Sequence, residues 1–165
     1  MIAAVPISIR EAVADDAPAA CRVLRRSIVE LCGADHGNDP EIVQRWLANK
    51  TPEVVASWIA RADNSVLVAV EGRTLCAVGS VTDIGEITLC YVSPDARFRG
   101  VSRALLRALE SRAVERGSTR CTLHSTETAR RFCRDAGYVE DGPPDGKFGA
   151  SGGYPMSKQL VPPQP

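Results

Sequence analysis

The segment from Val92 to Ser102, VSPDARFRGVS, has residue types and spacing that could bind an anion. An extended run ends at Pro94, a short loop follows, and a helical apolar pattern begins at Val101. The first amides of a helix lack intrahelical partners and carry partial positive charge, so this junction is typical of phosphate sites. Gly100 allows the backbone to approach a ligand closely. The glycine patterns of P-loops and dinucleotide-binding Rossmann folds are missing, which argues against both.

Positive charge is concentrated in the same region, although the 20 basic and 20 acidic side chains of the 165 residues cancel. From Arg97 to Arg134 there are ten arginines and three glutamates. The overall pI of 6.7 argues against a nucleic-acid partner, which would favour a basic face over the whole domain. A small phosphorylated ligand needs only a local positive region. Arginines on solvated helix faces would give the same pattern.

Hydrophobic periodicity indicates which elements position this segment. Ile7 and Ile9 alternate in a short edge strand, and Asp15 or Asp16 is expected to cap the helix that follows. Three extended runs with short turns between them predict an antiparallel meander at 65–72, 73–81 and 85–92. The other predicted elements are helices from Pro40 and Pro52, helices at 101–116 and 126–136, and strands at 120–124, 138–139 and 155–160.

Composition predicts one globular domain, because 44% of the residues are apolar and no run approaches the length of a membrane span. We expect the domain to cover residues 1–161, with a flexible loop at 142–153 and a disordered Pro-rich tail at 162–165. The start of the chain does not resemble a secretory signal, so a cytoplasmic location is expected. The six cysteines form no CxxC pair, which predicts reduced thiols and no metal site.

Three motifs resemble those of the GNAT superfamily of acyltransferases. The pattern Val-x-Pro-x-x-Arg-x-x-Gly-x-Ser at 92–102 is similar to its acetyl-CoA signature, with Ser102 where Gly or Ala is usual. Residues 126–138 resemble the later N-x-x-A-x-x-F-Y-x-x-x-G-F motif, with Cys133 in place of tyrosine, and 86–92 resemble a strand of the histone-acetylating branch. The resemblance implies an α/β (α+β) fold: a mixed, mostly antiparallel twisted sheet of about seven strands, flanked by helices and splayed between the fourth and fifth strands.

The resemblance implies acetyl-CoA as cosubstrate, with no metal. The pantetheine arm is expected to pair like an extra strand with Cys90, Tyr91 and Val92. The pyrophosphate is expected on backbone amides of the loop and helix start, with a charge-assisted bond from Arg97 or Arg99. The resemblance assigns pyrophosphate binding to Arg97, Phe98, Arg99, Gly100, Val101, Ser102 and Arg103.

A protonated amine must lose a proton before it can attack a thioester, so a base is needed. The resemblance places Glu86 at the base position, acting through water, and His124 is the alternative; either could instead be a strand-end residue without a catalytic role. Cys133 could protonate the departing thiolate or could be a buried helix residue, in which case Tyr138 or water would serve. A covalent acyl-cysteine route through Cys133 or Cys90 lacks a partner base in the sequence.

The predicted function is transfer of an acetyl group from acetyl-CoA to a primary amine of a small molecule or peptide, by direct attack in a ternary complex. The alternatives are a CoA-binding or regulatory module without catalysis and a nucleic-acid binder using the arginine-rich region. No membrane partner is expected, and a homodimer is one option for the assembly.

An acidic turn could recognise the amine or could simply cap helices, and both tryptophans are expected in the core. The acidic turn consists of Asp35, His36, Asp39 and Glu41, and the two tryptophans are Trp46 and Trp58.

Overall fold

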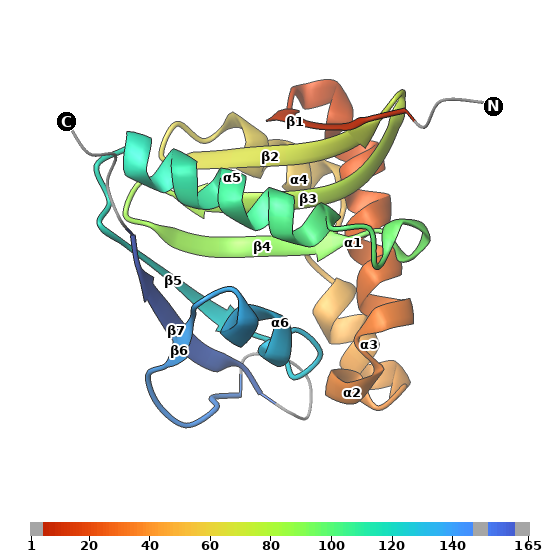
Figure 1. Cartoon of the computed structure of the whole chain (residues 1–165). Helices are drawn as coiled ribbons and strands as arrows, with labels where there is room; N and C mark the ends of the chain where they lie inside the picture. The colour runs from red at the N-terminus through yellow and green to blue at the C-terminus, as the bar shows by residue number, and fades with distance from the viewer. Residues whose placement is uncertain (1–4, 147–151, 161–165) are drawn as a thin grey trace.

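The computed structural model describes residues 5–146 and 152–160, whose strands form one seven-stranded sheet (Figure 1). The strand order is β1-β2-β3-β4-β5-β7-β6, and every neighbouring pair is antiparallel except β4 and β5. The mixed, mostly antiparallel sheet therefore has the predicted architecture. The strands are β1 (Ile7–Glu11), β2 (Asn64–Glu71), β3 (Thr74–Thr82), β4 (Glu86–Val92), β5 (Arg120–Ser125), β6 (Val139–Glu140) and β7 (Tyr154–Gln159).

Helices cover both faces of the sheet and bury a core on each. On one face, Leu105 and Leu109 of α5 are fully buried against the central strands. On the other face, Leu24 of α1 and Val55 of α4 pack with Val68 of β2. The helices are α1 (Ala17–Leu31), α2 (Gly33–His36), α3 (Pro40–Leu47), α4 (Pro52–Ala60), α5 (Val101–Glu115) and α6 (Arg130–Asp135). No described helix has the length and apolar character that a membrane crossing requires.

The sheet opens between β4 and β5. These strands pair in parallel only where Glu86 lies opposite Thr122 and Ile87 lies opposite Leu123. Beyond this point β5 diverges from β4, as Figure 1 shows, and pairs with β7. The backbone of β4 from residue 88 to 92 consequently has a strand partner only on its β3 side among the described residues. The splay between the fourth and fifth strands is confirmed.

Three local predictions were wrong. The helix predicted at 126–136 begins at Arg130, because a turn capped by the Thr126 hydroxyl precedes it. Asp16 does not cap α1; its carboxylate accepts from the Val13 amide at 2.7 Å and pairs with Arg10. The turn predicted after Cys32 contains the short helix α2.

All six cysteines are free thiols in the structure. The Pro-rich tail at 162–165 and the middle of the predicted loop at 142–153 lie outside the described residues. Within the described part of that loop, Asp145 and Gly153 form an antiparallel bridge.

Candidate active site

The start of α5 forms one wall of a cavity of about 490 Å³, here named the α5 cavity. Gly100 precedes the helix with φ of 76°, and its carbonyl accepts the first helical hydrogen bond, from the Ala104 amide at 3.1 Å. The amides of residues 101–103 therefore have no intrahelical acceptors, and they carry partial positive charge at the wall of the cavity. The opposite wall is the β4 backbone from residue 87 to 92, where the sheet is splayed. The predicted anion loop and the predicted open strand thus line one cavity.

Most of the arginine-rich region does not contribute charge to this cavity. Six of its ten arginines form ion pairs with carboxylates: Arg99, Arg112, Arg116, Arg120, Arg130 and Arg134. Arg99 forms its ion pair with Glu71 and does not line the cavity. Arg97 and Arg103 do line it, and neither forms an ion pair with a described carboxylate. The Arg97 guanidinium lies 4.5 Å from the centroid of the Phe98 ring, and Phe98 is 90% exposed.

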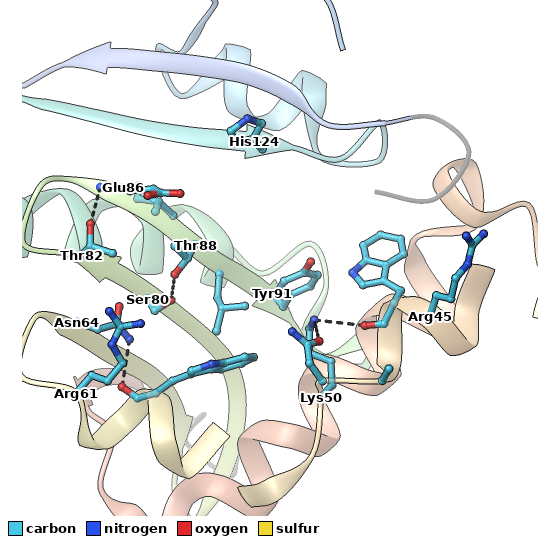
Figure 2. A pocket seen from close by; sticks show the side chains of 16 residues that line it. Arg45, Lys50, Arg61, Asn64, Ser80, Thr82, Glu86, Thr88, Tyr91 and His124 are labelled. Atoms are coloured by element: carbon cyan, nitrogen blue, oxygen red, sulfur yellow. Dashed lines mark hydrogen bonds between the residues drawn. The ribbon is translucent and has the colours of Figure 1, made fainter. Parts of the chain in front are cut away.

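A second cavity of about 490 Å³, the α4 cavity, lies on the other face of the sheet between α3, α4 and β4 (Figure 2). Glu86 lines this cavity at the start of β4, where its backbone amide donates a hydrogen bond to the Thr82 hydroxyl oxygen at 3.1 Å. Five residues on the two diverging strands line both cavities: Ile87, Thr88, Leu89 and Tyr91 of β4, and His124 of β5. The two cavities therefore meet at the gap in the sheet.

Glu86 and His124 lie on either side of this gap (Figure 2). The His124 imidazole Nε2 is 3.1 Å from the Asp145 carboxylate, which orients the ring. Thr88 lies where the β3–β4 register shifts, and its hydroxyl bonds to that of Ser80. Both candidate bases therefore lie at the junction of the cavities.

The candidate cysteines Cys133 and Cys90 and the candidate tyrosine Tyr138 lie in different parts of the structure. Cys133 is buried and lines the α5 cavity, where burial raises the pKa of its thiol. Cys90 also lines this cavity, and burial raises the pKa of its thiol to about 12. Tyr138 lines neither cavity; it lies in the core, and its hydroxyl donates to Glu110 of α5 at 2.8 Å. Burial, followed by this bond, raises the pKa of Tyr138.

The chain matches the model of the acetyltransferase (GNAT) domain over residues 34–160. It belongs to the GNAT acetyltransferase family. A search of curated proteins gave no significant match. Family membership assigns this GNAT domain to the acetyltransferases, and the splayed sheet and anion loop described above are consistent with that assignment.

Solved structures of other GNAT proteins share the fold along their whole length. The PaiA N-acetyltransferase of Thermoplasma acidophilum, solved with coenzyme A, is 19% identical with a TM-score of 0.82, covering 94% of this chain and 99% of its own. A GCN5-related N-acetyltransferase of Rhodopseudomonas palustris is 23% identical with a TM-score of 0.82, covering 97% and 99%. An aminoglycoside 6'-N-acetyltransferase complexed with coenzyme A is 16% identical with a TM-score of 0.69, covering 96% and 99%.

In the acidic turn of this GNAT domain, two carboxylates accept hydrogen bonds from backbone amides, as the capping interpretation expects. Asp35 and His36 are 1% exposed. The Asp35 carboxylate accepts from the amides of Glu127 and Thr128, and the Asp39 carboxylate caps α3 by accepting from the Glu41 amide at 2.9 Å. None of the four acidic-turn residues lines either cavity, so the capping interpretation holds.

The expectation that both tryptophans lie in the core is confirmed in part. Trp58 packs against the α1-side core, and Trp46 and Trp58 both line the α4 cavity, which the sequence did not predict. Helical periodicity could not reveal this, since the wall of an apolar cavity and a core face have the same spacing. Lys50 and Thr88 also line the α4 cavity. Nothing in the sequence near Lys50 marks it as part of a site, and Thr88 lies in the 86–92 segment already singled out but was given no role there.

Proposed function

We propose that this protein transfers the acetyl group of acetyl-CoA to a primary amine by direct attack, with both substrates bound together. The observation that carries the proposal is the meeting of two cavities at the gap between β4 and β5. Thr88 and His124 belong to both walls, so ligands entering from opposite faces of the sheet can touch there. Direct transfer needs this arrangement because the nucleophile and the acyl carbon must come into contact.

The α5 cavity has the donors that coenzyme A requires. Unpaired amides at residues 101–103 suit the pyrophosphate, and Arg97 and Arg103 add positive charge. The β4 backbone at residues 88–92 offers amides and carbonyls to the pantetheine arm, as a neighbouring strand would. When bound, acetyl-CoA supplies an acyl group activated as a thioester. Coenzyme A in related GNAT structures supports this assignment.

Glu86 is proposed as the base that accepts the amine proton, directly or through one water. A free amine has a pKa of about 10, so most of it is protonated at neutral pH and cannot attack. Glu86 lies in the α4 cavity beside the gap, while His124 lies across the gap with its ring held by Asp145. Glu86 is preferred because it lines only the cavity through which the amine would enter.

Cys133 is proposed as the proton donor to the departing thiolate. Burial raises the pKa of its thiol, so the thiol is protonated at neutral pH and has a proton to give. The same raised pKa, and that of Cys90, disfavour a covalent acyl-cysteine route, which needs a thiolate. Tyr138 is a weaker candidate because its hydroxyl is bonded to Glu110 within the core.

Substitution of Glu86 by glutamine tests the proposal. We expect Glu86→Gln to lower kcat for acetylation of an amine panel by about 100-fold, because general bases contribute on this order. The dissociation constant for coenzyme A should change less than about twofold, because Glu86 does not line the α5 cavity. Thioester release gives the rate, and calorimetry gives the binding constant.

Three outcomes would overturn parts of this proposal. If the wild-type protein binds coenzyme A but acetylates no amine, the protein is a binding module. Parallel rather than intersecting initial-velocity lines would indicate a covalent intermediate instead of a ternary complex. If His124→Gln abolishes turnover while Glu86→Gln preserves it, His124 is the base.

A further inference from the structure

Among the residues that line the α4 cavity, basic side chains outnumber carboxylates. Its lining includes the cations Arg45, Lys50 and Arg61, whereas Glu86 is its one carboxylate. Arg61 is exposed and is paired with Asp63 at 2.9 Å, outside the cavity lining. A polycationic acceptor would be repelled by this wall, and an anionic group would be attracted to it.

Lys50 is the unusual member of this set because its charge is buried without a counter-ion. The residue is only 8% exposed, and its ammonium donates to the Trp46 carbonyl at 3.3 Å and to Asn49 Oδ1 at 2.6 Å. It forms no ion pair with any carboxylate in the described part of the chain. An ammonium has three protons to donate, so one remains for a ligand (Figure 2). A buried charge is costly when nothing compensates it, and an anion in the cavity would compensate this one.

Lys50 lies at a distance from the reacting end of the cavity. Its ammonium donates to the Trp46 carbonyl, and the Trp46 side chain lines the cavity together with Tyr91. Tyr91 is three residues beyond Thr88 on β4, which corresponds to about 10 Å along a strand. A ligand that reached from Glu86 to Lys50 would therefore be several bonds long (Figure 2). Its middle would lie beside Trp46 and Trp58, and the Trp58 ring centroid is 6.0 Å from Lys50 Nζ.

We propose that the acceptor is an amine that carries a carboxylate several bonds away from its nucleophilic nitrogen, with the carboxylate bound by Lys50 and the nitrogen between Glu86 and His124. Linear ω-amino acids and short peptides with a free carboxyl end belong to this class. The proposal rests on the function proposed above, and it excludes polyamines and other polycations as preferred substrates. Burial lowers the pKa of the Lys50 ammonium, and a bound carboxylate would raise it again.

Ligands of equal length test the proposal at the level of binding. Trp46 and Trp58 are the two tryptophans of the chain, so their fluorescence reports directly on this cavity. We expect hexanoate, which has no amine, to change the fluorescence of the wild-type protein at a lower concentration than hexylammonium does. The change should be lost in Lys50→Gln, which retains a polar side chain of similar length. Equal responses to both ions, or an unchanged hexanoate response in Lys50→Gln, would overturn the assignment of Lys50 whether or not the protein is catalytic.

Acetylation of 6-aminohexanoate, hexylamine and hexane-1,6-diamine then tests the substrate class. We expect kcat/KM for the amino acid to exceed that for the other two by about tenfold, on the scale of one charge-assisted hydrogen bond. Lys50→Gln should remove this preference mainly through KM, whereas a fold defect would lower turnover of all three amines alike. In the matched variant Arg61→Gln the preference should persist, because Asp63 already pairs with that guanidinium.

The outcomes separate this proposal from the one on which it rests. A wild-type preference for the diamine or the neutral amine would overturn the carboxylate assignment and leave acetyl transfer standing. Loss of the preference in Arg61→Gln but not in Lys50→Gln would place the carboxylate elsewhere and overturn the role of Lys50. If none of the three amines is acetylated, the substrate class is wrong, and acetylation within the broader amine panel decides the function itself.

Discussion

At the residue scale, Gly100 and Gly117 form a matched pair at the two ends of α5. Both have positive φ, 76° and 92°, and a Cβ added at either would meet no atom within 4 Å. Alanine at either position should therefore cost a similar free energy of unfolding, about 1–2 kcal/mol, because of the left-handed backbone alone. Only Gly100 lines the α5 cavity, where its open space is on the ligand side.

We expect Gly100→Ala to weaken coenzyme A binding by about tenfold or more, because the methyl group would push the pyrophosphate away from the amides of residues 101–103. Gly117→Ala should leave that affinity unchanged. Denaturant melts and calorimetry on both variants measure the two effects. Equal affinities in the two variants would mean that the pyrophosphate does not approach Gly100.

At the element scale, the buried carboxylate of Asp35 ties α2 to the turn after β5. It accepts three hydrogen bonds, from the Glu127 amide at 2.7 Å, the Thr128 amide at 3.2 Å and the Thr128 hydroxyl at 2.7 Å. Thr126 and Thr128 of this turn line the α5 cavity. A contact between residues some 92 positions apart thus supports one wall of the ligand site.

Removal of this carboxylate should therefore affect both stability and ligand binding. We expect Asp35→Ala to lower the free energy of unfolding by about 2–4 kcal/mol, because two backbone amides would lose their acceptor in a buried place. KM for acetyl-CoA should rise as the turn loosens. Asp39→Ala is the control: it removes the cap of α3, should cost about 1 kcal/mol, and should leave this KM unchanged. An unchanged KM for acetyl-CoA in Asp35→Ala would show that the turn keeps its position without the hydrogen bonds to Asp35.

The same contact explains which elements could be predicted from the sequence. The strands from 65 to 92 and the helix from Val101 follow from local periodicity and turn residues, and the structure has them within one or two positions. The start of α6 was misplaced because the amides of Glu127 and Thr128 are bonded to Asp35, a partner that no local pattern reveals. Local signals define an element, and distant contacts decide where it begins.

At the scale of the whole molecule, the two cavities were unequally predictable. The α5 cavity is built around one continuous segment, 92–103, so a motif was enough to find it. The α4 cavity takes residues from α3, α4, β2, β3, β4 and β5, and no stretch of sequence contains its pattern. Lys50, Trp46 and Thr88 can be recognised as parts of one cavity only once the fold brings them together. A binding site with a local motif can be predicted from sequence, whereas a cavity assembled from six elements cannot.

The divided sheet predicts how coenzyme A should act on the protein. β1 to β4 and β5 to β7 are joined across the sheet by only two residue pairs, so a ligand between β4 and β5 adds a connection that the free protein lacks. At a concentration 100 times its dissociation constant, such a ligand stabilises the folded state by about 2.7 kcal/mol. For a chain of this length, that corresponds to a rise in Tm of about 5–11 °C.

Hydrogen exchange locates the source of this stabilisation. The segments 88–92 and 101–103 should exchange more slowly with coenzyme A than without it, because they line the α5 cavity. The β1–β2 pair lies at the far edge of the sheet and should show protection that changes only as much as global stability does. Backbone exchange measured by mass spectrometry resolves these segments. A rise in Tm with no selective protection of β4 and the α5 start would mean that coenzyme A binds elsewhere, and the proposed meeting of the two substrates at the gap would fail with it.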